Sequence, residues 1–121
     1  MERDNVVQRK SFDFAVKAIK LSYSIQEKRN EYDLSRQLIR CSSSIGANLE
    51  EAMGGYSDKD FLHKVTISYK EARETDFWIR LMEKVGLISH DEKAELQKDI
   101  KEILRLLGAI RRTMKNKLKK K

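Results

Sequence analysis

The chain of 121 residues contains no proline, one cysteine and five glycines. Proline is the residue that most strongly interrupts a helix, so its absence, together with 37% charged residues, is typical of a protein built from long helices. A single cysteine excludes an internal disulfide bond. Because Cys41 lies on an apolar helical stripe, we expect it to be a packed thiol rather than a nucleophile.

The chain also lacks a long apolar segment. Five of its first ten residues are charged and no long apolar run follows them, a pattern that does not match a signal peptide. The longest run without a charged residue, 41–49, is far too short to cross a bilayer. We therefore expect a single cytoplasmic domain that makes no contact with a membrane.

The formal net charge of +7 is concentrated at one end of the chain. Basic and acidic residues cancel up to residue 110, so the whole excess belongs to a basic tail over residues 111–121. The tail has no acidic residue and no aromatic side chain. Its cations are Arg111, Arg112, Lys115, Lys117, Lys119, Lys120 and Lys121.

Apolar spacing and turn residues divide residues 1–110 into four helices. Ser11 and Ser57 are predicted N-caps, Ser89 and Glu92 form a predicted capping box, and Gly54-Gly55 is expected to end a helix in the left-handed conformation. The predicted loops of three to five residues are so short that neighbouring helices must lie antiparallel. The predicted fold class is therefore all-α, an antiparallel up-and-down four-helix bundle. The expected helices cover about residues 11–28, 33–53, 57–85 and 89–115, the last continuing into the basic tail and fraying there.

Polar residues recur beside the apolar stripes of the second and third helices. If the two helices form a hairpin that turns at residues 54–57, Arg40 faces Glu71, and Lys64 lies within reach of Asn48 or Glu51. Buried polar groups of this kind cost several kcal/mol unless each finds a partner. We predict a structural polar network made of Gln37, Arg40, Ser44, Asn48, Glu51, Lys64, Ser68, Glu71 and Thr75.

Two interpretations of this network remain open. It could line a catalytic or ligand pocket, or it could be a satisfied network that sets the register of the helices. If it is buried, removing Arg40 or Glu71 would cost on the order of 3–5 kcal/mol. Metal binding is poorly supported, because Asp60-x-x-His63 is the only near match to a di-iron motif and His90 has no ligand partner in the sequence. We therefore expect no enzyme, no metal and no cofactor.

The first helix carries apolar residues on two nearly opposite sides. Phe12, Val16, Ile19 and Tyr23 form one stripe. The second stripe and the broad end of the third helix supply the predicted oligomer interface: Phe14, Ala18, Leu21, Ile25, Trp78, Leu81 and Val85. A wide stripe buried within a single chain is the alternative.

Three blocks of sequence resemble a known family. They are residues 43–52 (SSIGANLEEA), the spaced motif Ser57-x-x-Asp60-Phe61-x-x-Lys64, and residues 70–81 (KEARETDFWIRL). They are similar to the bacterial four-helix-bundle proteins encoded in intervening sequences of 23S ribosomal RNA genes, over about residues 10–110. The resemblance implies an up-and-down bundle that assembles as a ring, most often a pentamer. It also implies kinship in fold with the nucleic-acid-binding accessory protein of diversity-generating retroelements.

Two functions follow as hypotheses. The first is a non-enzymatic homo-oligomer whose basic tails bind the phosphates of RNA or DNA, with little sequence specificity because the tail has no aromatic side chain. The second is a structural or protein-interaction scaffold that uses the Trp78–Leu81–Val85 surface or a face of the ring. A tail that only improves solubility remains the alternative to nucleic-acid binding.

Overall fold

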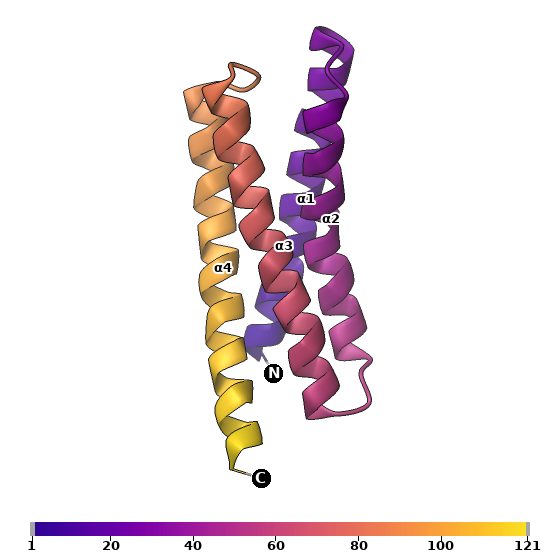
Figure 1. Ribbon diagram of the computed structural model, residues 1–121, viewed down its shortest axis with the longest axis vertical. Coiled ribbons are helices and arrows are strands. Elements are labelled where there is room, and N and C mark those ends of the chain that lie inside the picture. Colours follow the sequence, from indigo (N-terminus) through magenta and orange to yellow (C-terminus); the bar gives the residue numbers. More distant parts are fainter. Residues whose placement is uncertain (1, 121) are drawn as a thin grey trace.

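The computed structural model describes the backbone of residues 2–120 and the side chains of residues 6–120. In this part of the chain each helix runs antiparallel to the one before it, so the start of the first helix and the end of the last lie at the same end of the molecule (Figure 1). The predicted all-α four-helix bundle is confirmed. Its helices are α1 (Glu2–Arg29), α2 (Asp33–Met53), α3 (Asp58–Lys84) and α4 (His90–Lys119).

The helices contact one another in a closed square. In the described part of the chain α1 packs on α2, α2 on α3, α3 on α4 and α4 on α1, and the α1–α4 seam is the most loosely packed. Each helix contributes one stripe at steps of three and four residues to the core, which is what a helix with one buried face requires. The largest fully buried side chains include Phe14, Leu38, Ile45, Leu49, Ile79, Ile100, Ile103 and Leu107.

Local hydrogen bonds explain where three of the helices begin. The Glu31 carboxylate accepts from the backbone N–H groups of Leu34 and Ser35 at the start of α2. Ser57 accepts from the backbone of Asp60 at the start of α3, as predicted. The predicted capping box of α4, between Ser89 and Glu92, is confirmed.

The prediction of a left-handed glycine after α2 is wrong. Gly54 has φ −93°, which other residues also adopt. The following Gly55 is constrained by space instead, because a Cβ there would lie 2.4 Å from the Asp60 carboxylate and 3.2 Å from the Ala52 carbonyl oxygen. Gly86, just after α3, has the positive φ of 83° that favours glycine.

Both outer ends of the bundle extend further than expected. Helix α1 begins at Glu2 rather than at Ser11, and Ser11 is fully buried within the helix instead of capping it. Helix α4 continues past the expected end near residue 115 to Lys119, where Lys117 pairs with Asp58 of α3 and Leu118 is half-buried. The basic residues 111–119 are therefore part of a packed helix rather than a frayed tail.

Candidate functional site

The hairpin of α2 and α3 brings together the charged residues that the sequence pairs. Arg40 donates to Glu71, with an Nη1–Oε2 distance of 3.4 Å, to Glu74, and to Gln37 at 3.3 Å. Lys64 pairs with Glu51 at 3.0 Å. The predicted register of the hairpin is therefore correct, and Glu74 is a member of the network that the sequence pattern did not single out.

The smaller polar residues of the network bond mainly within their own helices. Ser44 donates to the carbonyl oxygen of Arg40, Asn48 to that of Ser44, and Thr75 to that of Glu71. Ser68 crosses between the helices, since its hydroxyl donates to the Ile45 carbonyl oxygen at 2.8 Å. The close approach of α2 to α3 therefore depends on a buried serine. Of the two partners expected within reach of Lys64, Glu51 is the one that it pairs with.

The network lies nearer to the surface than the sequence pattern suggested. The Arg40 side chain is 49% exposed and the Glu51 side chain 60% exposed. Fully buried members are Ser68 and Thr75, which are small and satisfied. The expectation of a buried ion pair is therefore corrected: each pair joins one exposed side chain, Arg40 or Glu51, to a partly buried partner that is 21% (Glu71) or 28% (Lys64) exposed.

This exposure changes the expected effect of removing Arg40. We expect Arg40→Ala to lower the free energy of unfolding by less than about 1 kcal/mol, because water screens a half-exposed ion pair. Urea denaturation of the variant and the unmodified protein, at one protein concentration, measures the difference. A loss of about 3 kcal/mol or more would contradict the surface assignment, and Lys64→Ala is the matched control on the other exposed pair.

Cys41 is buried in the α2 stripe. Burial raises the pKa of its thiol to about 11, and its sulfur lies 3.8 Å from the Leu38 carbonyl oxygen. A thiol with such a pKa is almost entirely protonated at neutral pH, so its surroundings are those of a packed side chain.

The basic tail is ordered by contacts with α3. Arg111 lies over the Tyr69 ring at 4.6 Å and donates to the Thr66 hydroxyl at 3.3 Å, and Lys117 pairs with Asp58 at 3.1 Å. These two cations have structural partners. Within the described residues the other tail cations are exposed and form no ion pair: Arg112, Lys115, Lys119 and Lys120. Lys121 lies outside the described residues.

The prediction for the oligomer surface is partly reversed. Phe14, Ala18 and Ile25 are buried against the chain's own helices, and Leu21 is half-buried beside them, so they form the inward face of α1. The opposite stripe is exposed, including Phe12 at 69% and Tyr23 at 59%. The two stripes are about equally apolar, so the sequence pattern did not indicate which one faces inward.

The exposed α1 stripe borders an apolar groove between α1 and α2. The groove has a volume of about 340 Å³, and its floor includes the fully buried Ser11, whose hydroxyl has no hydrogen-bond partner among the described residues. It is lined mainly by Phe12, Ala15, Val16, Ile19, Gly46 and Ala47. We call these residues and Tyr23 the α1–α2 apolar surface.

The other predicted surface, at the end of α3, is half-buried. The Trp78 indole donates to Glu74 at 3.0 Å and its ring meets that of Phe77 edge-on at 5.2 Å. Leu81 is half-buried beside it, whereas Val85 is 56% exposed. The exposed large apolar side chains of this surface are Phe77 and Val85.

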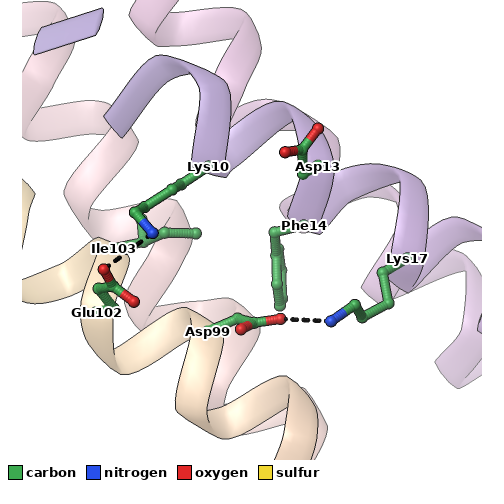
Figure 2. Close-up of a pocket in the computed structure, with 7 residues that line it drawn as sticks. All are labelled: Lys10, Asp13, Phe14, Lys17, Asp99, Glu102 and Ile103. Carbon is green, nitrogen blue, oxygen red and sulfur yellow. Dashed lines mark hydrogen bonds and ion pairs between the residues drawn. The ribbon is translucent and has the colours of Figure 1, made fainter. Parts of the chain in front are cut away.

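A charged cavity of about 200 Å³ separates α1 from α4 (Figure 2). Lys10 pairs with Glu102 at 3.0 Å, and Lys17 pairs with Asp99 at 2.8 Å and with Glu95 at 3.0 Å. Phe14 points into the space between the two pairs (Figure 2). The hydrogen bond to Asp99 is the main cause that raises the pKa of Lys17. The pairs bridge the loosest seam of the bundle, a contact that the sequence pattern did not predict.

The described residues were also searched for metal ligands and for membrane-spanning helices. Within residues 6–120 no three His, Cys, Asp or Glu side chains are grouped so that they could hold a metal ion. His63 and His90 are both exposed near the starts of their helices. None of the described helices combines the length and apolar character needed to cross a membrane.

The fold and the surface define a small antiparallel four-helix-bundle protein with a heavily charged exterior. The model of the 23S rRNA-intervening sequence protein family matches residues 3–109. The chain belongs to this family. A crystal structure of a protein of unknown function, from the S23 ribosomal protein family of Bacteroides thetaiotaomicron, superposes with a TM-score of 0.89 at 36% identity, covering 91% of this chain and 98% of that one. A comparison with curated proteins found no match.

Proposed function

We propose that the chain is a cytoplasmic, non-enzymatic homo-oligomer that binds the phosphate backbone of RNA or DNA through the C-terminal part of α4. The observation that carries this proposal is the group of exposed cations without ion pairs at that end: Arg112, Lys115, Lys119 and Lys120. Lys and Arg side chains held at fixed positions on a helix release counterions from phosphates, which makes such binding strong and salt-dependent.

Assembly into an oligomer is supported by the α1–α2 apolar surface. Phe12, Val16 and Tyr23 are exposed large apolar side chains on one helix face, and contiguous patches of this kind mark interaction sites. A second copy of the chain is the proposed occupant, and the pentamer implied by the family resemblance is the expected number. Assembly would also multiply the cationic helix ends on one particle, which raises the avidity for a polyanion.

The experiment replaces tail cations without removing core residues. Truncation after Ile110 would delete the buried Met114, so we use Arg112→Gln, Lys115→Gln and Lys119→Gln together. We expect the slope of log affinity against log salt on a duplex to fall in magnitude by about 2.7, and affinity at 0.1 M salt to fall on the order of a hundredfold. Fluorescence anisotropy with labelled RNA and DNA at several salt concentrations measures both.

The matched control removes the same charges elsewhere. Lys20→Gln, Lys28→Gln and Arg36→Gln also replace two lysines and one arginine, all exposed and without ion pairs in the described part of the chain. This variant should bind within about threefold of the unmodified protein, because it loses only long-range attraction. Equal affinity of the tail variant and the unmodified protein would refute binding through the tail.

A second candidate function is a protein-interaction scaffold. The exposed Phe77 and Val85 beside the half-buried Trp78 support it, since aromatic groups at a surface are enriched in interfaces. Capture of a partner at high salt, abolished by Val85→Glu and unaffected by the tail substitutions, would favour the scaffold over nucleic-acid binding.

A further inference from the structure

Helix α4 separates its charges between two faces. Glu95, Asp99 and Glu102 pair with lysines of α1, so the acidic face lies at the α1–α4 seam. No acidic residue follows Glu102 in the sequence. The basic residues recur at steps of three, four and seven, which places them on one other face of the helix. We call this set the α4 cationic stripe: Lys98, Lys101, Arg105, Arg112, Lys115 and Lys119.

The stripe is open to solvent along its length. Each of its six side chains is exposed, and none forms an ion pair with another described residue. Between Arg105 and Arg112 the stripe lacks a cation for one helical step, and Gly108 occupies that position. A Cβ at Gly108 would lie 3.8 Å from the Arg112 guanidinium and 3.9 Å from the Tyr69 ring. The gap is therefore bordered by a cation and an aromatic ring rather than by an acid.

Helix α3 adds cations beside the stripe. The register of α3 against α4 is set by Gln97, which donates to Asp76 at 3.0 Å, and by the bond from Arg111 to Thr66. Lys70 and Arg73 follow Thr66 by one and two helical turns, so they share its face. Both are exposed, and neither forms an ion pair within residues 6–120. The positive surface therefore spans two helices and begins well before the tail.

We propose that the α4 cationic stripe is a docking surface for duplex nucleic acid, which lies lengthwise along α4 and is recognised by its phosphates. This inference rests on the proposed function and extends it from the tail to a stripe that starts at Lys98. From residue 98 to residue 119 the helix is about 32 Å long, close to one turn of a duplex at about 34 Å. A rigid helix holds its cations in place, so binding sacrifices less conformational entropy than binding by a flexible tail.

A duplex fits the stripe better than a single strand. Proteins that hold single strands offer aromatic rings on which successive bases stack. The stripe has no aromatic residue, and the neighbouring Tyr69 ring is covered by the Arg111 guanidinium at 4.6 Å. The stripe presents positive charges at fixed spacing and no side chain that would recognise a base. A stiff nucleic-acid duplex, whose phosphates lie in regular rows, matches this arrangement.

The test removes the part of the stripe that precedes the tail. Lys98→Gln, Lys101→Gln and Arg105→Gln leave all tail cations in place, and the Lys20, Lys28 and Arg36 variant is the matched control. Anisotropy is measured with labelled 20-base-pair RNA and DNA duplexes and with a single strand of the same length. We expect duplex affinity of the stripe variant to fall on the order of a hundredfold at 0.1 M salt, with a slope smaller by about 2.7.

The outcomes separate this inference from the proposed function. If the unmodified protein binds no nucleic acid, the proposed function fails. If it binds and the tail variant weakens while the stripe variant does not, the tail alone binds and the stripe is overturned. If the stripe variant and the matched control lose the same affinity, binding responds only to net charge and the stripe is overturned. If the unmodified protein binds the single strand more tightly than the duplexes, the proposal that the ligand is a duplex is rejected. Circular dichroism of each variant verifies the fold.

Discussion

Phe14→Ala should lower the free energy of unfolding by about 3–5 kcal/mol, whereas Phe12→Ala should lower that of the monomer by less than about 1 kcal/mol. The two phenylalanines are two residues apart on α1. Phe14 is 2% exposed and packs in the core, while Phe12 is 69% exposed. Removing a buried ring loses its transfer free energy and leaves a cavity, and neither loss applies to the ring already in water.

Urea denaturation measures both variants. Because assembly stabilises the folded state by mass action, the curves are recorded over a range of protein concentrations, and the low-concentration limit describes the monomer. The pair contains its own control, since the substitution is the same at both sites. Equal costs, or a larger cost at Phe12, would mean that α1 is rotated relative to the structure and that the exposed stripe is the inward one.

Val16→Glu should dissociate the proposed oligomer. Val16 is 39% exposed and lines the apolar groove between α1 and α2, so a second copy docked there would bury the new carboxylate without a partner. Such burial costs several kcal/mol, which weakens association by at least about a hundredfold. Light scattering after size exclusion should give the mass of a single chain, and circular dichroism should give an unchanged helix content.

Val85→Glu provides the matched control on a different surface. Val85 is the exposed valine at the end of α3, so the same substitution there should leave the oligomer intact if copies meet through α1 and α2. If Val85→Glu dissociates the oligomer and Val16→Glu does not, the copies meet through the Trp78–Leu81–Val85 surface instead. An unmodified protein that is monomeric at high concentration would refute the oligomer itself.

Much of the α2–α3 hairpin could be predicted from the sequence. Its turn and its apolar spacing define which residues face one another, so the pairing of Arg40 with Glu71 followed from residue numbers. The partner of Lys64 was narrowed to Asn48 or Glu51, and the structure has Glu51. The solvent exposure of these pairs could not be predicted from the sequence. Solvent exposure depends on how each helix is rotated about its axis. A small rotation is enough to bury or to expose a polar residue that lies beside an apolar stripe.

The orientation of α1 shows the same limit. Phe12 and Phe14 belong to stripes of similar size and hydrophobicity, and either could have faced the core. The choice is made by tertiary partners that are distant in sequence: the Phe14 stripe packs into the core, and the exposed pairs of Lys10 and Lys17 with acidic residues of α4 accompany that orientation. The end of α4 lies beyond the expected residue 115 for a related reason, since Lys117 pairs with Asp58 of α3, a residue distant in sequence.

The square arrangement of the helices has a consequence for how the chain folds. Three of its four seams join helices that are consecutive in sequence, and contacts of this kind are formed with little loss of loop entropy. Folding in milliseconds or less is expected, beginning in the hairpins. The loosely packed α1–α4 seam joins the two ends of the chain and closes last. Substitutions along it, such as Phe14→Ala, should therefore accelerate unfolding much more than they slow folding.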